Sequence, residues 1–217
     1  MDKGRCAVSV SNVIPALNTE SYLIMTESKK VYIGMGSNLG DSRRHLLEAI
    51  REIDAVPGVK VTACSSLYST KPVGPQDQNY FINAVAELET AIEAHELLRE
   101  MFKIENRHHR VRVRHWGERT LDLDVLYYGN ETFCDDELKV PHPEIFNRAF
   151  VVIPLLEINP EFTHNDGRKL RDVLPSLPAD DVRAMRRLSY LENRSGRAGG
   201  KGKWLTLRAW SKYRYGL

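Results

Sequence analysis

Two aspartates separated by one residue, Asp122 and Asp124, carry the strongest chemical signal in this chain. They fall in residues 121–128, whose composition is typical of a β-strand, and alternate side chains of a strand share one face. Two carboxylates held side by side repel each other unless a divalent cation lies between them, and all-oxygen ligands suit Mg²⁺. Leu121, Leu123 and Val125 should then face a core. An exposed strand edge with solvated charges is the alternative interpretation.

Arginines gather just before this strand, and guanidinium groups bind phosphate in a bidentate manner. They are Arg107, Arg110, Arg112, Arg114 and Arg119. Together with the two carboxylates, they predict a site for a metal ion and a polyphosphate. Each of Arg107, Arg112 and Arg114, taken singly, can instead be an ordinary charge of a solvated loop.

The composition excludes several classes of protein. The chain has 217 residues, of which 42% are hydrophobic and 28% are charged, as in ordinary globular proteins. It has no run of about 18 apolar residues, and its N-terminus lacks the apolar segment of a signal peptide. The three widely spaced cysteines predict neither a disulfide framework nor a zinc site. We therefore expect a cytoplasmic protein without a membrane span.

The charge is unevenly distributed along the chain. The formal net charge is +2, yet residues 183–217 hold ten Lys and Arg residues against one acidic residue, Glu192. We expect an irregular N-terminal extension at 1–28, a folded domain at 29–178 and a basic, flexible tail at 179–217. Aromatic residues among the basic ones of the tail are the only hint of a nucleic-acid partner, and a tail unrelated to function is the favoured interpretation.

Hydrophobic periodicity predicts elements in the order β-α-β-β-α-β. The expected strands span 31–35, 59–68, 81–88 and 121–128, and the expected helices run from Asp41 as N-cap to Pro57 and from 93 to 107. This order is that of a ferredoxin-like α+β sandwich, in which helices pack on an antiparallel sheet.

Further elements are expected towards the C-terminus. A turn at Gly129 and Asn130 should bring a short strand at 132–134 back against the strand at 121–128. The connector Val140-Pro141-His142-Pro143 should be rigid, and a helix at 147–157 should lie on the sheet, although Pro154 limits it.

Five separated motifs stand in the order and rough spacing of one family. They are Gly36-Ser37-Asn38-Leu39-Gly40, residues 69–78, Phe81-Ile82-Asn83-Ala84, residues 116–124, and Val140-Pro141-His142 followed by Asn147-Arg148. On these motifs the chain closely resembles the 6-hydroxymethyl-7,8-dihydropterin pyrophosphokinases of folate synthesis, over roughly residues 31–177.

The resemblance implies transfer of diphosphate from ATP to the pterin hydroxymethyl group, with release of AMP. Asp122 and Asp124 match residues that hold two Mg²⁺ ions along the triphosphate of ATP. Arg110 and Arg119 match residues that contact phosphates, and with the two aspartates they are the candidate catalytic residues. His142 and Arg148 match contacts on the nucleotide side.

The resemblance also implies a pterin pocket. The pterin would lie between rings that match Phe81 and Phe150, with Asn83 satisfying its hydrogen-bonding edge. The other residues expected to line the pocket or its closing loop are Gly36, Thr70, Val73 and Trp116. From the residues alone, the phenylalanines are equally typical of a core, Asn83 of a buried amide, and His142 of a loop.

The chain departs from the family pattern at three positions. His109 stands where a glycine commonly precedes the loop arginine, Glu118 where a proline is usual, and Phe102 where a glutamine often contacts the nucleotide. These departures concern loop movement and adenine contacts, and not the metal chemistry.

Two other interpretations of the site are weaker. Nucleotidyltransferases place a Gly-Ser turn and an Asp-x-Asp strand close together in sequence, whereas Gly36 and Asp122 lie 86 positions apart here. A binding module without catalysis is the remaining alternative, and the presence of every expected metal and phosphate residue argues against it.

Overall fold

The computed structural model describes residues 28–110 and 117–189. Apart from Ser28, the expected N-terminal extension lies outside the described residues. Within the described part of the chain, no helix is long and apolar enough to cross a membrane.

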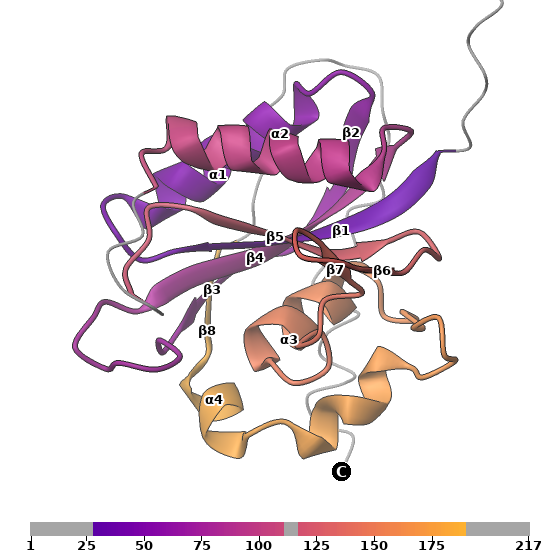
Figure 1. The fold of residues 1–217 in the computed structure, drawn as a ribbon. Coiled ribbons are helices and arrows are strands. Elements are labelled where there is room, and N and C mark those ends of the chain that lie inside the picture. The colour runs from indigo at the N-terminus through magenta and orange to yellow at the C-terminus, as the bar shows by residue number, and fades with distance from the viewer. Residues whose placement is uncertain (1–27, 111–116, 190–217) are drawn as a thin grey trace, which may run out of the picture.

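The structure is built on one antiparallel sheet (Figure 1). Its strands are β1 (Lys29–Ser37), β2 (Val59–Cys64), β3 (Leu67–Thr70), β4 (Phe81–Thr90), β5 (Asp122–Tyr128) and β8 (Arg186–Ser189). The order is β5-β1-β4-β3-β8, and β2 also pairs with β4. Strands β5, β1 and β4, with β2 and β3 beyond, reproduce the split β-α-β arrangement of the ferredoxin-like fold, so the expected fold class is confirmed.

Two helices cover one face of this sheet, α1 (Ser42–Asp54) and α2 (Ala94–Arg107) (Figure 1). The Asp41 carboxylate accepts the Arg44 backbone N–H at 3.0 Å, which confirms the expected N-cap. The buried faces of both helices share one core cluster with Leu121, Leu123 and Val125, and α2 packs directly on β5. The inward-facing residues of β5 are therefore in the core, as predicted.

The other face of the sheet is covered by α3 (Ala149–Ile158); the 3₁₀-helix η2 (Leu170–Ser176) packs on α3, and the short α4 (Ala179–Ala184) follows it (Figure 1). Tyr32, Val85 and Leu126 project to this side and pack on Val152 and Leu155. Pro154 lies within α3 without ending it. The helix expected to lie on the sheet is therefore present.

The strand expected at 59–68 is interrupted, which corrects the sequence prediction. Ser65 and Ser66 separate β2 from β3. The Ser65 hydroxyl accepts the Val85 backbone N–H at 2.9 Å, and the Ser66 backbone N–H and hydroxyl donate to Glu157 of α3 at 2.9 and 2.7 Å. Partners far along the chain break the strand, although its apolar pattern continues.

The short strand after Gly129 does not pair with β5, which is a second correction. Strand β6 (Phe133–Cys134) pairs instead with β7 (Lys139–Val140) in a separate two-stranded sheet. The Asp135 carboxylate accepts the backbone N–H groups of Glu137 and Leu138 at 2.9 and 2.8 Å, which closes the tight turn between β6 and β7.

The fold continues past residue 178, where the sequence analysis placed the start of the tail. Residues 179–189 form α4 and β8, and β8 pairs with β3. Arg187 of β8 donates to Glu157 at 2.6 Å and to the Ser66 hydroxyl at 2.7 Å. The predicted start of the tail is therefore corrected, because the partners of Arg187 lie 30 and 121 positions away in the sequence. Residues 190–217 lie outside the described part of the chain.

Helix α2 ends in a Schellman motif with an unusual residue in it. The backbone N–H of His109 donates to the Asn106 carbonyl at 3.0 Å, and that of Arg110 donates to the Glu105 carbonyl at 3.1 Å. This motif requires a left-handed residue at the position of His109, which has a φ of 57°. His109 thus occupies a conformation that glycine adopts without strain.

Replacing His109 with Gly should raise the free energy of unfolding by roughly 0.5–1 kcal/mol. A side chain in the left-handed region costs about 1–2 kcal/mol, and the greater freedom of glycine in the unfolded chain offsets part of that gain. Urea denaturation measures the change. His109→Ala is the control, because it removes the imidazole and keeps the Cβ. Equal stability of the two variants would contradict backbone strain as the cause.

Candidate functional site

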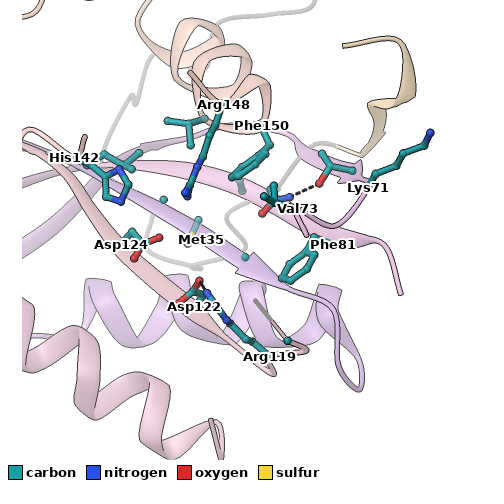
Figure 2. Close-up of a pocket in the computed structure, with 18 residues that line it drawn as sticks. Met35, Lys71, Val73, Phe81, Arg119, Asp122, Asp124, His142, Arg148 and Phe150 are labelled. Carbon is teal, nitrogen blue, oxygen red and sulfur yellow. Dashed lines mark hydrogen bonds and ion pairs between the residues drawn. The ribbon is translucent and has the colours of Figure 1, made fainter. Parts of the chain in front are cut away.

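A cavity of about 260 Å³ lies where β1, β4 and β5 meet the loop after β3 and the start of α3 (Figure 2). Eleven of the thirteen site residues that the family resemblance implies line it: Gly36, Thr70, Val73, Phe81, Asn83, Arg119, Asp122, Asp124, His142, Arg148 and Phe150. Arg110 lies beside the cavity in contact with Asp122. Trp116 lies outside the described residues.

Asp122 and Asp124 both face the cavity from β5 (Figure 2), which agrees with the alternation expected of a strand. In the antiparallel pairing with β1, Asp122 lies opposite Gly36 and Asp124 lies opposite Gly34. Both glycines line the cavity beside the carboxylates, and an added Cβ at Gly34 would come within 3.2 Å of the Leu126 side chain. At Gly36, an added Cβ would come within 2.9 Å of the Asn83 amide oxygen, so a larger residue cannot be accommodated there without movement.

The carboxylates are held at an electrostatic cost. Burial raises the pKa of Asp124, and the neighbouring charges of Asp122 and Glu105 raise it further, while Arg110 and Arg119 act in the opposite direction. A divalent cation between the two aspartates would remove this repulsion. The donors are carboxylate oxygens from one face of one strand, which is the chemistry that Mg²⁺ prefers, so the residues fit this ion.

Two arginines flank Asp122 and bind different oxygens of its carboxylate. Arg110 donates through Nη2 to Oδ1, and Arg119 donates through Nη1 to Oδ2. The Asp122 side chain is only 14% exposed, so these ion pairs are shielded from solvent. The prediction that arginines and the acidic pair form one cluster holds for these two residues.

The backbone of Arg119 is held by Asn38, which the sequence analysis cited only as part of a motif. The Asn38 amide oxygen accepts the Arg119 N–H at 2.8 Å, and the Asn38 N–H donates to the Arg119 carbonyl at 3.0 Å. The side-chain amide of Asn38 also donates to Gln78 at 2.9 Å. Asn38 therefore joins the turn after β1 and the loop before β4 to the segment that carries the arginine.

His142 and Arg148 contribute polar groups to the acidic end of the cavity (Figure 2). The Nδ1 of His142 accepts the Glu144 backbone N–H at 3.1 Å, so the neutral ring carries its proton on Nε2. Burial and then the charge of Arg148 lower the pKa of His142, which keeps the ring neutral. The Arg148 guanidinium lies 5.8 Å from the centroid of the Phe150 ring.

Phe81 and Phe150 lie towards the other end of the cavity, together with Val73 (Figure 2). Both rings are partly exposed and line the cavity, and Phe150 also packs against the core on the α3 side of the sheet. Asn83 also lines it, with 7% of its surface exposed, and its amide nitrogen donates to the Thr70 hydroxyl at 2.7 Å. The pocket interpretation of these residues is the one that their positions support.

Some residues differ in place from what the sequence suggested. Arg107 is paired at 2.6 Å with Glu52 of α1, away from the cavity, so it is an ordinary surface charge. Lys71 and Met35 line the cavity and were not anticipated. Arg112 and Arg114 lie outside the described residues.

Comparisons with known proteins agree with this geometry. A family model described as 7,8-dihydro-6-hydroxymethylpterin-pyrophosphokinase matches residues 32–160. The 2-amino-4-hydroxy-6-hydroxymethyldihydropteridine pyrophosphokinase of Haemophilus influenzae is 47% identical over 127 residues, which cover 58% of this chain and 79% of that protein. The enzyme of the same name from Pseudomonas aeruginosa is 38% identical over 154 residues, which cover 71% of this chain and 95% of that protein.

A solved structure supports the fold. The chain superposes with a TM-score of 0.59 on a Plasmodium falciparum HPPK-DHPS variant crystallised with pterin and p-hydroxybenzoate, at 13% identity. The match covers 78% of this chain and 49% of that one, so this chain spans about half the length of that solved protein.

The fold and site define an α+β sandwich whose cavity joins paired carboxylates and arginines to a partly aromatic pocket. The match to the family model and the two bacterial relatives make the assignment specific: the chain belongs to the 7,8-dihydro-6-hydroxymethylpterin-pyrophosphokinase family.

Proposed function

We propose that this protein transfers the diphosphate group of ATP to 6-hydroxymethyl-7,8-dihydropterin, giving AMP and the pterin diphosphate in folate biosynthesis. One observation carries the proposal: in a member of this family, a single cavity has acidic and basic groups at one end and aromatic and amide groups at the other. A cytoplasmic location remains a prediction from the sequence.

The acidic end of the cavity would take the polyphosphate of ATP. Asp122 and Asp124 would hold magnesium, with two ions proposed. When bound, Mg²⁺ neutralises phosphate charge and orients the polyphosphate. Arg148 and neutral His142 supply N–H donors at the same end, so phosphate oxygens would meet charged and uncharged donors together.

The aromatic end would take the pterin. A flat heterocycle gains dispersion and quadrupole energy against aromatic faces, which Phe81 and Phe150 supply. The Asn83 amide, fixed by Thr70, would meet the polar edge of the ring. A site that satisfies such an edge rejects analogues that lack it, because its own buried polar groups are then left unpaired.

The reaction asks the protein mainly for position and charge. The pterin hydroxymethyl oxygen forms a bond to the β-phosphorus of ATP, the bond from that phosphorus to the oxygen bridging to the α-phosphorus breaks, and AMP leaves while the hydroxyl proton is released. Arg110 and Arg119, already gathered at Asp122, can offer their N–H groups to the oxygens on which charge develops.

The nucleotide products test the proposal directly. The full chain is incubated with Mg-ATP, with and without 6-hydroxymethyl-7,8-dihydropterin, and the nucleotides are separated. We expect AMP only when the pterin is present, and none when a chelator removes magnesium. Formation of ADP would show transfer of one phosphoryl group, and absence of any turnover would leave a binding protein. Either result would overturn the proposal.

A further inference from the structure

Glu105 of α2 is a buried carboxylate that the proposed site does not use. Its residue surface is 2% exposed, and it lies on the face of α2 that packs against β5. Its Oε1 accepts the backbone N–H of Leu123 at 2.7 Å, at the one residue between Asp122 and Asp124. Its Oε2 is paired with Nη1 of Arg110. One carboxylate thus contacts both the acidic strand and an arginine.

The backbone of Glu105 also holds Arg110. The Arg110 N–H donates to the Glu105 carbonyl at 3.1 Å in the Schellman motif that ends α2. Main chain and side chain of Glu105 therefore bind main chain and side chain of Arg110. Through these contacts Glu105 holds Arg110, which directly precedes residues 111–116 in the sequence.

Burying this carboxylate is costly, which argues that it has a specific role. Desolvation raises the pKa of Glu105, and the hydrogen bonds from Arg110 and from the Leu123 N–H oppose that rise. The same place on an amphipathic helix could hold leucine or methionine without this cost. The charge is therefore matched to something nearby, and Arg110 is that group.

Arg110 lies between two carboxylates, and this position indicates how Glu105 contributes to the site. Arg110 is shared between Glu105 and Asp122. Asp122 lines the cavity, so its oxygens are also open to a ligand, whereas Glu105 does not line the cavity. The contact of Glu105 with Arg110 can therefore persist whatever the cavity contains, and it aims the second Arg110 nitrogen at the acidic strand.

We propose that Glu105 is a positioning residue, which acts by holding the Arg110 guanidinium beside Asp122 and by holding the Asp122–Asp124 segment against α2. The inference rests on the proposed function. It assigns to Glu105 no contact with substrate and no proton transfer.

The test compares kcat with KM in the full chain. Glu105→Gln keeps an acceptor for the Leu123 N–H and loses the charge that pairs with Arg110. We expect kcat to fall about 10- to 100-fold, as for a misplaced catalytic group, and KM for the pterin to stay within about twofold because the pterin end is untouched. Glu105→Asp, which keeps the charge and shortens the reach, should show the same split. The comparison of kcat with KM is made on those variants whose thermal melts are cooperative.

A double-mutant cycle with Arg110→Ala separates positioning from a general structural role. If Glu105 acts through Arg110, Glu105→Gln should change kcat by less than about twofold in the Arg110→Ala background. If the kcat losses of Glu105→Gln and Arg110→Ala multiply in the double variant, the proposal is overturned. An unchanged kcat in both Glu105 variants would also overturn it. Glu100→Gln is the matched control, because Glu100 lies on the same helix in an exposed pair with Lys103 at 2.6 Å. AMP formation by the unaltered chain, measured first, tests the proposed function separately.

Discussion

Replacing Asp122 with Asn should reduce kcat at least about 10²- to 10³-fold, the range for loss of one electrostatic group in an active site. Asparagine keeps the shape and one oxygen, so the cavity remains, but one of the two charges proposed to hold magnesium is lost. The anionic partner of Arg110 and Arg119 is lost with it. The substitution therefore weakens both devices that would neutralise the polyphosphate.

The measurement is the rate of AMP formation at saturating pterin, over a range of magnesium concentrations. We expect a low maximum rate, reached only at a higher magnesium concentration than in the unaltered chain. Asp180→Asn is the control, because Asp180 lies on α4 with its side chain 87% exposed, and should leave kcat unchanged. A thermal melt of both variants reports whether they fold. Near-normal turnover of folded Asp122→Asn would refute its role.

The sequence was informative where local pattern and long-range packing agree. The alternation of β5 identified both the acidic face and the core face, since each follows from one strand lying between helices and a cavity. The N-cap of α1 depends on residues only three positions apart and was equally readable. The residues proposed to bind pterin were identified through the family resemblance, because Phe81 and Phe150 alone are typical of a core.

What the sequence missed depends on partners distant in the chain. Glu157 of α3 interrupts the strand at 59–68 from 91 positions away, and Arg187 of β8 binds the same carboxylate. Neither contact has a local signal. Glu105 did have one: it lies four residues after Met101 and next to Ile104, on the apolar stripe of α2. An acidic residue on a buried stripe indicates a partner, and that indication was available.

Arg119→Ala should lower kcat about 10³-fold or more, within the range for an arginine that stabilises phosphoryl transfer. Its KM for the pterin should change little, because the side chain lies at Asp122 and not beside the Asn83–Thr70 pair. Asn38 holds the Arg119 backbone through groups that alanine retains. The variant should therefore keep its local fold while losing the guanidinium.

Steady-state kinetics with each substrate varied in turn distinguish two roles for this guanidinium. Loss of kcat with unchanged KM means that Arg119 acts on charge that develops in the transition state, whereas unchanged kcat with a raised KM would make it only a binding residue. The kcat of Arg119→Lys should lie between that of the unaltered chain and that of Arg119→Ala. Lysine keeps the charge but loses the planar guanidinium that can bind two oxygens at once. The kcat and KM of Arg183→Ala, in an exposed pair on α4, should match those of the unaltered chain.

Since Arg110 and Arg119 bind separate oxygens of one carboxylate, removing either leaves the other in place, and the residual rate measures what a single arginine achieves.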